Sequence, residues 1–181
     1  AMDRVVKVTD AKGNATTYTY DAVGNVSTET NAKGVTTSYV YDANYNLTSL
    51  TDAAGTSTYL YDAMDRVVGQ TDRRGNTQWF RYDAIGRITA VRDKNGNLTE
   101  YIYDGNGNIV KTIDALGTEA VFTYNKNDQL ISMDLHRMDT VNNVDSHEIT
   151  LYEYDGRGLT TKQVDALGNV TTYAYDGNGN L

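Results

Sequence analysis

The chain has 181 residues, with fifteen Tyr against two Phe and one Trp, sixteen Gly, no Pro, no Cys, and a net charge of -8. With a pI near 4.6, the protein lacks the basic balance that nucleic-acid or anionic-membrane partners need, so neither is expected. The absence of Cys excludes disulfides, thiolate metal sites and cysteine nucleophiles, and no stretch reaches the ~18 apolar residues of a membrane-spanning helix.

The abundance of tyrosine and of turn residues favours a thin β structure. Tyr supplies rings that pack on one side while the hydroxyl stays hydrated. Gly, Asn and Asp tolerate the positive φ angles that tight turns require. We therefore expect a wall of β-hairpins instead of a thick globular core.

In chain order, the dipeptide Tyr-Asp recurs every 20 or 21 residues, with one larger interval. The tyrosines of this dipeptide, including one Tyr-Asn, are Tyr20, Tyr41, Tyr61, Tyr82, Tyr103, Tyr124, Tyr154 and Tyr175. A second aromatic residue precedes each by two positions: Tyr18, Tyr39, Tyr59, Phe80, Tyr101, Phe122, Tyr152 and Tyr173. Because side chains alternate between the faces of a strand, both rings of a pair project from one face and build two rows.

Each unit is predicted to contain two turns and two strands. In the unit that ends at Tyr41, we expect turns at 21–25 and 31–34 and strands at 26–30 and 35–41. The second turn of each unit closes on a glycine: Gly13, Gly34, Gly55, Gly75, Gly96, Gly117 and Gly168. The unit that ends at Tyr61 has one residue fewer after its glycine, and we expect the turn to absorb this deletion because a slip within the strand would turn the rings to the other face.

The whole chain, residues 1–181, is predicted to be a single array of about eight such units, enlarged at 125–153 and truncated at both ends. The expected fold class is all-β, with tandem β-hairpins stacked into a long antiparallel sheet. Open twisted sheets rarely exceed ~10 strands without curling, so we expect this sheet to curve into a spiral.

The repeated residues resemble the bacterial RHS, or Tyr-Asp, repeat family. Its unit runs Tyr-Asp-Ala-x-Gly-Arg/Asn-hydrophobic, then Asp-x-x-Gly and Tyr-x-Tyr-Asp, and residues 82–88 match the first part in full. Members include polymorphic toxins, shell subunits of insecticidal Tc toxins, and teneurins, in which the repeats form a hollow shell around a toxin or other segment. The resemblance implies a shell segment of a secreted or cell-surface bacterial protein, with neighbouring repeats and an enclosed C-terminal segment as partners. The Pro-containing self-cleavage signature of the family's shell-closing region is absent from this chain.

Three polar runs, at 93–97, 104–108 and 176–180, resemble oxygen-rich calcium loops such as Asp-Gly-Asn-Gly-Asn. None carries the trailing Glu of such a loop, and each falls where the repeat requires a turn. Asn-Gly and Asp-Gly are strong hairpin signals, so we interpret the runs as turns. We predict no metal ion and no cofactor for the chain.

Both histidines of the chain, His136 and His147, lie in the enlarged unit. Their polar neighbours in the sequence are Asp134, Asp139, Asp145, Ser146 and Glu148. A zinc or hydrolytic site needs closely set ligands or a Ser-His-acid geometry. The favoured interpretation is a longer hairpin with both histidines in a solvated loop, because insertions in repeat proteins usually project from the array. Zinc binding and hydrolysis are the alternatives.

Two functions fit the pattern. In the first, the chain is a non-catalytic wall segment whose tyrosine rows join neighbouring hairpins, since cross-strand aromatic pairs add about 0.2 to 1 kcal/mol each without a ligand. In the second, it is an extracellular module that binds carbohydrate or protein, because exposed Tyr faces stack on sugars. We also expect unpaired strand edges near Val5 and Tyr173, through which copies of the chain self-associate.

Overall fold

The computed structural model describes residues 3–139 and 144–181, and every regular element within them is a β-strand. None of the described residues forms a helix long and apolar enough to cross a membrane. The first eight strands are β1 Lys7–Thr9, β2 Ala15–Tyr20, β3 Val26–Thr30, β4 Thr36–Tyr41, β5 Leu47–Asp52, β6 Gly55–Tyr61, β7 Val67–Thr71 and β8 Thr77–Tyr82. The others are β9 Ile88–Arg92, β10 Leu98–Tyr103, β11 Ile109–Ile113, β12 Glu119–Tyr124, β13 Leu130–Asp139, β14 Val144–Tyr154, β15 Thr160–Val164 and β16 Val170–Thr172. The all-β fold expected from the repeat is confirmed.

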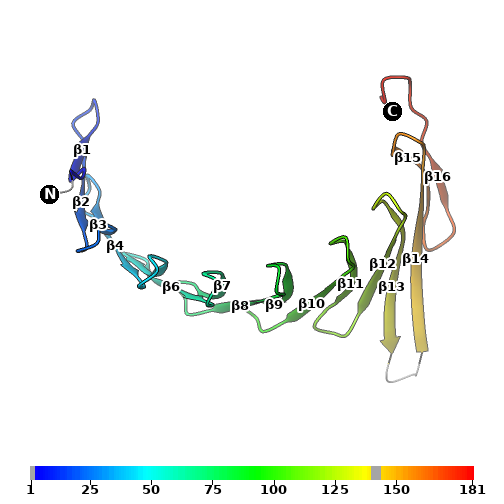
Figure 1. The fold of residues 1–181 in the computed structure, drawn as a ribbon, viewed down its shortest axis with the longest axis horizontal. Helices are drawn as coiled ribbons and strands as arrows, with labels where there is room; N and C mark the ends of the chain where they lie inside the picture. Colours follow the sequence, from blue (N-terminus) through cyan, green and yellow to red (C-terminus); the bar gives the residue numbers. More distant parts are fainter. Residues whose placement is uncertain (1–2, 140–143) are drawn as a thin grey trace. The chain divides into compact units, whose positions relative to one another are not determined.

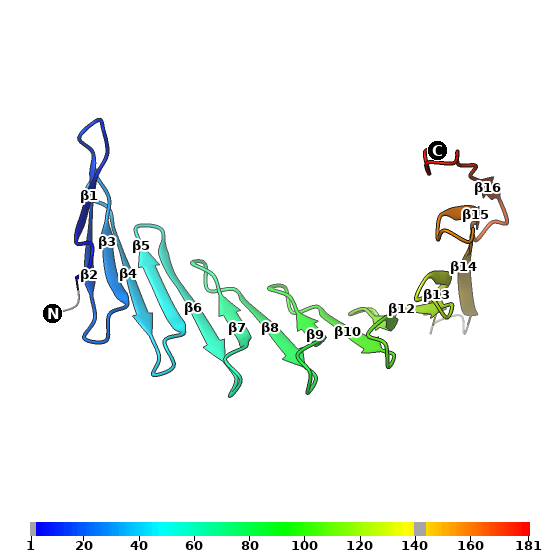
Figure 2. The same cartoon turned by 45° about the horizontal axis from the view of Figure 1, so that its top comes forward.

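The strand order in the sheet equals the order in the sequence, β1 to β16, as the colours from blue to red show in Figure 1. The chain divides into two compact units, Ala1–Arg81 with Arg92–Gly96 and Tyr82–Val91 with Asn97–Leu181. In the first unit, β1 to β8 lie side by side, each antiparallel to the next (Figure 2). In the second, β10 to β16 continue the same meander.

Both kinds of turn in a repeat have the same backbone geometry. In the Tyr-Asp turn, the amide of Asp21 donates to the carbonyl of Asn25 at 2.9 Å, and in the other turn Asn31 donates to Val35 at 3.0 Å. The fourth residue of each turn takes a left-handed conformation, with φ of +77° at Gly34. This is a type I turn followed by a residue at positive φ, the common three-residue hairpin loop. The turn at 31–34 and the strand at 26–30 therefore form where the sequence placed them, and β4 starts one residue later than expected.

Gly55 departs from the predicted role of a turn glycine. The turn between β5 and β6 contains only Ala53 and Ala54, and Gly55 is the first residue of β6, paired with Asp52. Its φ of +127° is larger than the φ of the other glycines with positive φ, which runs from +77° to +111°. This unit is one residue shorter than the others, and the turn is the part that is shorter. A shorter strand would have shifted Tyr59 and Tyr61 to the other face of the sheet.

A β-bulge recurs immediately before the Tyr-Asp tyrosine of successive repeats, where regular strands were expected from the sequence. Thr19 pairs with Thr28 whereas Tyr20 pairs with Val26, so Ser27 is the extra residue on β3. The same register shift occurs at the tyrosines Tyr41, Tyr61, Tyr103, Tyr124 and Tyr154. A bulge bends its strand and increases the local twist. Six repeats of the described chain therefore carry the same backbone distortion at the same place.

The sheet is thin, with little fully buried apolar surface. Among the described residues, Ala90 is the one buried hydrophobic side chain, at 3% exposure. Residues between the two rings of a pair face away from the rows and are exposed, as Val40 (56%) and Leu60 (52%) illustrate. Stability must therefore come mainly from contacts between adjacent strands and adjacent repeats.

Candidate functional site

All sixteen aromatic residues of the two predicted rows are half-buried, and the residue between the two members of each pair is exposed. Tyr18 and Tyr20, for example, flank the exposed Thr19 on β2. Tyr173 and Tyr175 follow the last residue of β16, and the amide of Tyr173 donates to the carbonyl of Thr161. The alternation places both members of a pair on one face of the sheet.

Five of the Tyr-Asp tyrosines donate their hydroxyl to a backbone carbonyl, which corrects the expectation of hydrated hydroxyls for these residues. Tyr103 donates to the carbonyl oxygen of Ile88 at 2.7 Å, one repeat upstream. The equivalent bonds run from Tyr20 to Val5, Tyr61 to Leu47, Tyr124 to Ile109 and Tyr154 to Leu130, at 2.7 to 2.9 Å. In four of these five bonds the accepting carbonyl belongs to the first residue of a strand, which is Leu47 in β5, Ile88 in β9, Ile109 in β11 and Leu130 in β13. The tyrosine thus ties its own repeat to the distorted backbone of the previous one.

The pKa values of several row tyrosines report the same environment. Burial raises the pKa of the Tyr61 and Tyr124 hydroxyls above their ordinary value of 10.0, and it does the same for Tyr41. In the other row, Tyr39 donates to Glu29 Oε2 at 3.4 Å, and burial is again the largest cause of its raised pKa. The rings therefore act as packing elements and their hydroxyls as hydrogen-bond donors within the sheet.

Arginine at the fifth position of a Tyr-Asp turn, as at Arg87, forms a second connection between repeats. Arg87 binds Asp83 Oδ2 at 2.6 Å within its own turn, and its Nη1 donates to the carbonyl of Asp104 at 3.2 Å. Its guanidinium lies 4.5 Å from the centre of the Tyr103 ring, a cation–π geometry. Arg4 repeats this arrangement over Tyr20 at 5.3 Å. One side chain thus supports the next turn and the next tyrosine together.

Replacing Arg87 by Asn, the residue that other repeats carry at this position, is expected to lower stability by about 1 kcal/mol, because Asn reaches its own turn aspartate but not the next tyrosine ring. Urea unfolding monitored by circular dichroism measures the change. Arg92→Asn is the matched control, since Arg92 Nε donates to the carbonyl of Gly96 in the adjacent turn at 3.4 Å and the Arg92 side chain has no other hydrogen bond among the described residues. Equal losses from the two substitutions would contradict the role assigned to Arg87.

The first residue of each turn accepts backbone hydrogen bonds through its side chain. Asp104 Oδ1 accepts the amides of Asn106 and Asn108 at 2.9 Å, and Asp104 Oδ2 accepts the Asn108 side chain at 3.0 Å. These bonds, led by that from the Asn108 side chain, hold the pKa of Asp104 below 3.8. The polar run at 104–108 is therefore a hairpin turn whose carboxylate is occupied by its own backbone.

Within residues 3–139 and 144–181, three turns carry a residue other than glycine at positive φ: Tyr45, Asp65 and Asp128. Asp128 Oδ1 accepts the side-chain amides of Asn106 and Asn108, both at 2.8 Å, in the preceding Tyr-Asp turn. Asp65 binds Asn44 and Asn46 in the same way. The left-handed conformation costs an L-residue roughly 1 to 2 kcal/mol, and two hydrogen bonds offset it. The sequence signal for this contact was the replacement of the turn glycine by Asp.

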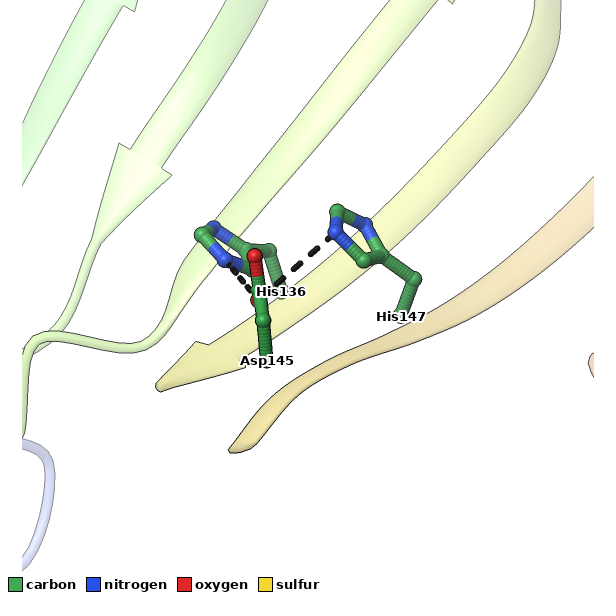
Figure 3. Close-up of side chains that lie close together, drawn as sticks. All are labelled: His136, Asp145 and His147. Carbon is green, nitrogen blue, oxygen red and sulfur yellow. Dashed lines mark ion pairs between the residues drawn. The ribbon is translucent and has the colours of Figure 1, made fainter. Parts of the chain in front are cut away.

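The enlarged unit contains the antiparallel pair of long strands β13 and β14, and residues 140–143 lie outside the described residues. Both histidines lie within these strands and not in a loop, which corrects the loop interpretation. His136 and His147 are directly paired across the two strands, and their rings stack with centroids 4.7 Å apart and planes 11° from parallel. One carboxylate oxygen of Asp145, Oδ1, is in ion-pair contact with a nitrogen of each ring (Figure 3).

Two further carboxylates contact the other nitrogens of these rings. His147 Nδ1 lies 2.8 Å from Asp134 Oδ2, and His136 Nδ1 lies 3.7 Å from Glu119 Oε2. The hydrogen bond to Asp134, together with the charges of Asp134 and Asp145, raises the pKa of His147 above 6.5. Lys111 Nζ binds Glu119 Oε1 at 2.6 Å, which links a lysine of β11 to this group.

Comparison with known proteins identifies the repeat. The family model named RHS Repeat matches residues 3–36, 20–57, 41–77, 82–119 and 154–181. No curated protein sequence matches the chain significantly.

Solved structures of Tc toxin components share the fold. The crystal structure of TcdB2-TccC3 matches 96% of this chain with a TM-score of 0.67 at 20% identity, over 11% of that chain. TcdB2-TccC3 without its hypervariable C-terminal region matches 97% of this chain with a TM-score of 0.66 at 19% identity, over 10% of that chain. The Photorhabdus luminescens Tc holotoxin pore, with a mutated TccC3, matches 90% with a TM-score of 0.60 at 23% identity, over 10% of its chain. This chain spans about a tenth of the length of these neighbours. Because the family model covers most of its residues, the chain belongs to the RHS repeat family.

Proposed function

We propose that this chain is a non-catalytic wall segment of an encapsulating shell. The observation that carries the proposal is that the repeated polar side chains bind groups inside the sheet. The Tyr-Asp tyrosine and the turn aspartate recur and bind the neighbouring repeat or their own turn, as Tyr103 and Asp83 do. Where the fifth turn residue is arginine, as at Arg87, it binds both. A unit whose recurring polar groups are consumed by adjacent units builds a continuous surface.

The proposal extends to partners and location. Further repeats of a longer shell would pair with the terminal strands, and a C-terminal toxin or other segment would be enclosed. Shared fold with TcdB2-TccC3, and the hypervariable C-terminal region named for that complex, support this assignment. A protein of this kind acts outside the cell, as a secreted or cell-surface bacterial component.

The terminal strands provide the test. All three residues of β1 and of β16 are exposed, and each of these strands has one neighbour in the strand order. Strands with an unpaired edge recruit other strands. We expect the 181-residue chain to self-associate with rising concentration, more strongly at high salt, because salt screens the repulsion of its -8 net charge. Sedimentation velocity measures the mass distribution, and a strict monomer at every concentration and salt level would contradict the wall assignment.

Binding of carbohydrate or of a partner protein at the tyrosine rows is the alternative function. The half-buried rings and the bonded hydroxyls of Tyr61 and Tyr103 disfavour it, since a sugar platform presents an open ring face. A glycan array probed with the labelled chain separates the two functions. The wall segment is expected to show no saturable binding, and saturable binding lost on Tyr103→Ala would favour the alternative.

A further inference from the structure

We propose that His136, Asp145 and His147 form a binding site for a divalent transition-metal ion, with Zn²⁺ as the ion that suits the ligand set. One ligand atom from each residue can be chosen so that the three lie within 4.8 Å of one another. The site joins β13 to β14 in the enlarged hairpin, where the repeat pattern of the rest of the array is interrupted.

The backbone register sets the position of the three side chains. His136 pairs with His147, and Met138 pairs with Asp145, so Asp145 and His147 are two residues apart on β14 and share a face. Glu119 pairs with His136 across β12 and β13, and Asp134 is two residues before His136. The group therefore lies on one face of β12, β13 and β14, the face opposite to Phe122 and Tyr124.

The orientation of the imidazole rings is the observation that points to a cation. Both Nε2 atoms face Asp145 Oδ1, that of His147 at 3.6 Å and that of His136 in closer contact (Figure 3). Both Nδ1 atoms face the outer carboxylates of Asp134 and Glu119. An imidazole that donates from Nδ1 to a carboxylate presents an electron pair at Nε2, which is the arrangement of metal-bound histidines in proteins.

The unpaired atoms of the group support the same conclusion. Within the described part of the chain, His136 Nε2 is buried and has no aligned hydrogen bond, although Asp145 is its ion-pair neighbour. Asp134 Oδ1 is also buried without a hydrogen-bond partner there. Buried polar atoms are costly unless they are satisfied. A cation placed between Asp145 and the two Nε2 atoms satisfies His136 and neutralises part of the surrounding negative charge.

The donor set favours a borderline transition metal over a hard cation. Imidazole nitrogen and carboxylate oxygen bind Zn²⁺ at about 2.0 to 2.2 Å, whereas Ca²⁺ and Mg²⁺ prefer oxygen alone. Ligand atoms of a tetrahedral Zn²⁺ site lie about 3.4 Å apart. Ligand atoms that are up to 4.8 Å apart must therefore approach by about 1 to 1.5 Å, and the close contact between His136 Nε2 and Asp145 Oδ1 must widen. Asp145 and His147 are nearly half exposed, and their side chains are free to make this adjustment. Water completes the coordination.

Protons compete with the metal for the same nitrogens. The charged groups that face the rings are Lys111 from β11, Glu119 from β12, Asp134 from β13 and Asp145 from β14. The three carboxylates favour a cation at the rings. Ligand nitrogens must be free of protons to bind a metal ion, so metal affinity is expected to fall as the pH is lowered.

Calorimetric titration of the 181-residue chain with Zn²⁺ tests the site. We expect one ion per chain at slightly alkaline pH and at least tenfold weaker binding about two pH units lower. His136→Ala, His147→Ala and Asp145→Asn are each expected to weaken binding at least tenfold. Ser146→Ala, between Asp145 and His147 on the other face of β14, is the matched control and leaves the affinity unchanged. Circular dichroism checks that each variant is folded.

Nitrogen NMR of the unmodified protein gives a readout that does not depend on any variant. Zn²⁺ is expected to shift the Nε2 resonances of both histidines more than their Nδ1 resonances. Mg²⁺ and Ca²⁺ serve as probes of a purely acidic cluster. Absence of saturable Zn²⁺ binding, equal binding of Ca²⁺, or Zn²⁺ binding that leaves the imidazole resonances in place would each overturn the proposal. Self-association of the chain is independent of this result, so the wall assignment is tested separately.

Discussion

Replacing Tyr101 and Tyr103 together by alanine is expected to destabilise the protein by about 2 to 4 kcal/mol, because two half-buried rings leave cavities between adjacent repeats. The double substitution also removes the hydroxyl that Tyr103 donates to Ile88 and the ring that supports the Arg87 guanidinium. In a repeat array, each unit is stabilised largely by its neighbours, so the substitution weakens the packing of β10 against the strands on both sides of it. Urea unfolding monitored by circular dichroism measures the free energy of unfolding.

Two controls separate ring packing from other effects of substitution. Ile102→Ala changes the residue between the two rings, which faces away from the rows and is 46% exposed, and is expected to cost clearly less. Tyr103→Phe keeps the ring and loses only the hydrogen bond, with an expected cost of about 1 kcal/mol. With a chelator present, His136→Ala combined with His147→Ala should leave stability almost unchanged. If the tyrosine pair and the histidine pair shifted the unfolding midpoint equally, the packing argument would fail.

Stability is expected to fall sharply in acid, below about pH 4, because the turn carboxylates are ionised in the folded protein. Their backbone and side-chain hydrogen bonds lower the pKa of each from its ordinary value of 3.8. The affected residues are Asp10, Asp21, Asp42, Asp52, Asp62, Asp72, Asp83, Asp104, Asp114, Asp155, Asp165 and Asp176.

The direction of this pH dependence follows from linkage. A carboxylate with a lowered pKa in the folded state binds fewer protons folded than unfolded near pH 4, so its stabilisation is complete above 3.8 and disappears as the pH falls through the folded value. His147 contributes in the opposite sense, because its raised pKa stabilises the folded protein below 6.5 and this contribution is lost at higher pH. Thermal melts between pH 7 and pH 2 record both effects.

Asparagine in place of a turn aspartate isolates the titration from the turn geometry. Asn31 and Asn125 already begin turns, and their Oδ1 atoms accept the same backbone amides as Asp104 does. Asp104→Asn should therefore keep the fold at neutral pH while reducing the acid sensitivity. Unchanged acid sensitivity in a variant with several such substitutions would show that other groups govern the acid transition.

The sequence alone predicted the repeat, its strands and most of its turns because these depend on local chemistry. Tyr-x-Tyr spacing specifies which face the rings take, and Asp-x-x-Gly specifies a tight turn, whatever the rest of the chain does. The strand Val26–Thr30 and the turn that closes on Gly34 follow directly from such rules. Even the shortened unit kept its ring spacing, because a one-residue slip would have exposed Tyr59 and Tyr61 to the wrong face.

The contacts between side chains of neighbouring repeats could not be predicted from the sequence, because they depend on the pairing register of the strands in the folded sheet. The bulge before Tyr103 and the bond from its hydroxyl to Ile88 depend on strand register, which no single unit encodes. His136 and His147 are eleven positions apart in the sequence, and only the pairing of β13 with β14 stacks their rings and brings Asp145 to both. Local sequence thus determines the shape of one hairpin, whereas contacts between hairpins depend on the strand register. The register places the Tyr103 hydroxyl beside the Ile88 carbonyl, and it brings His136, His147 and Asp145 together.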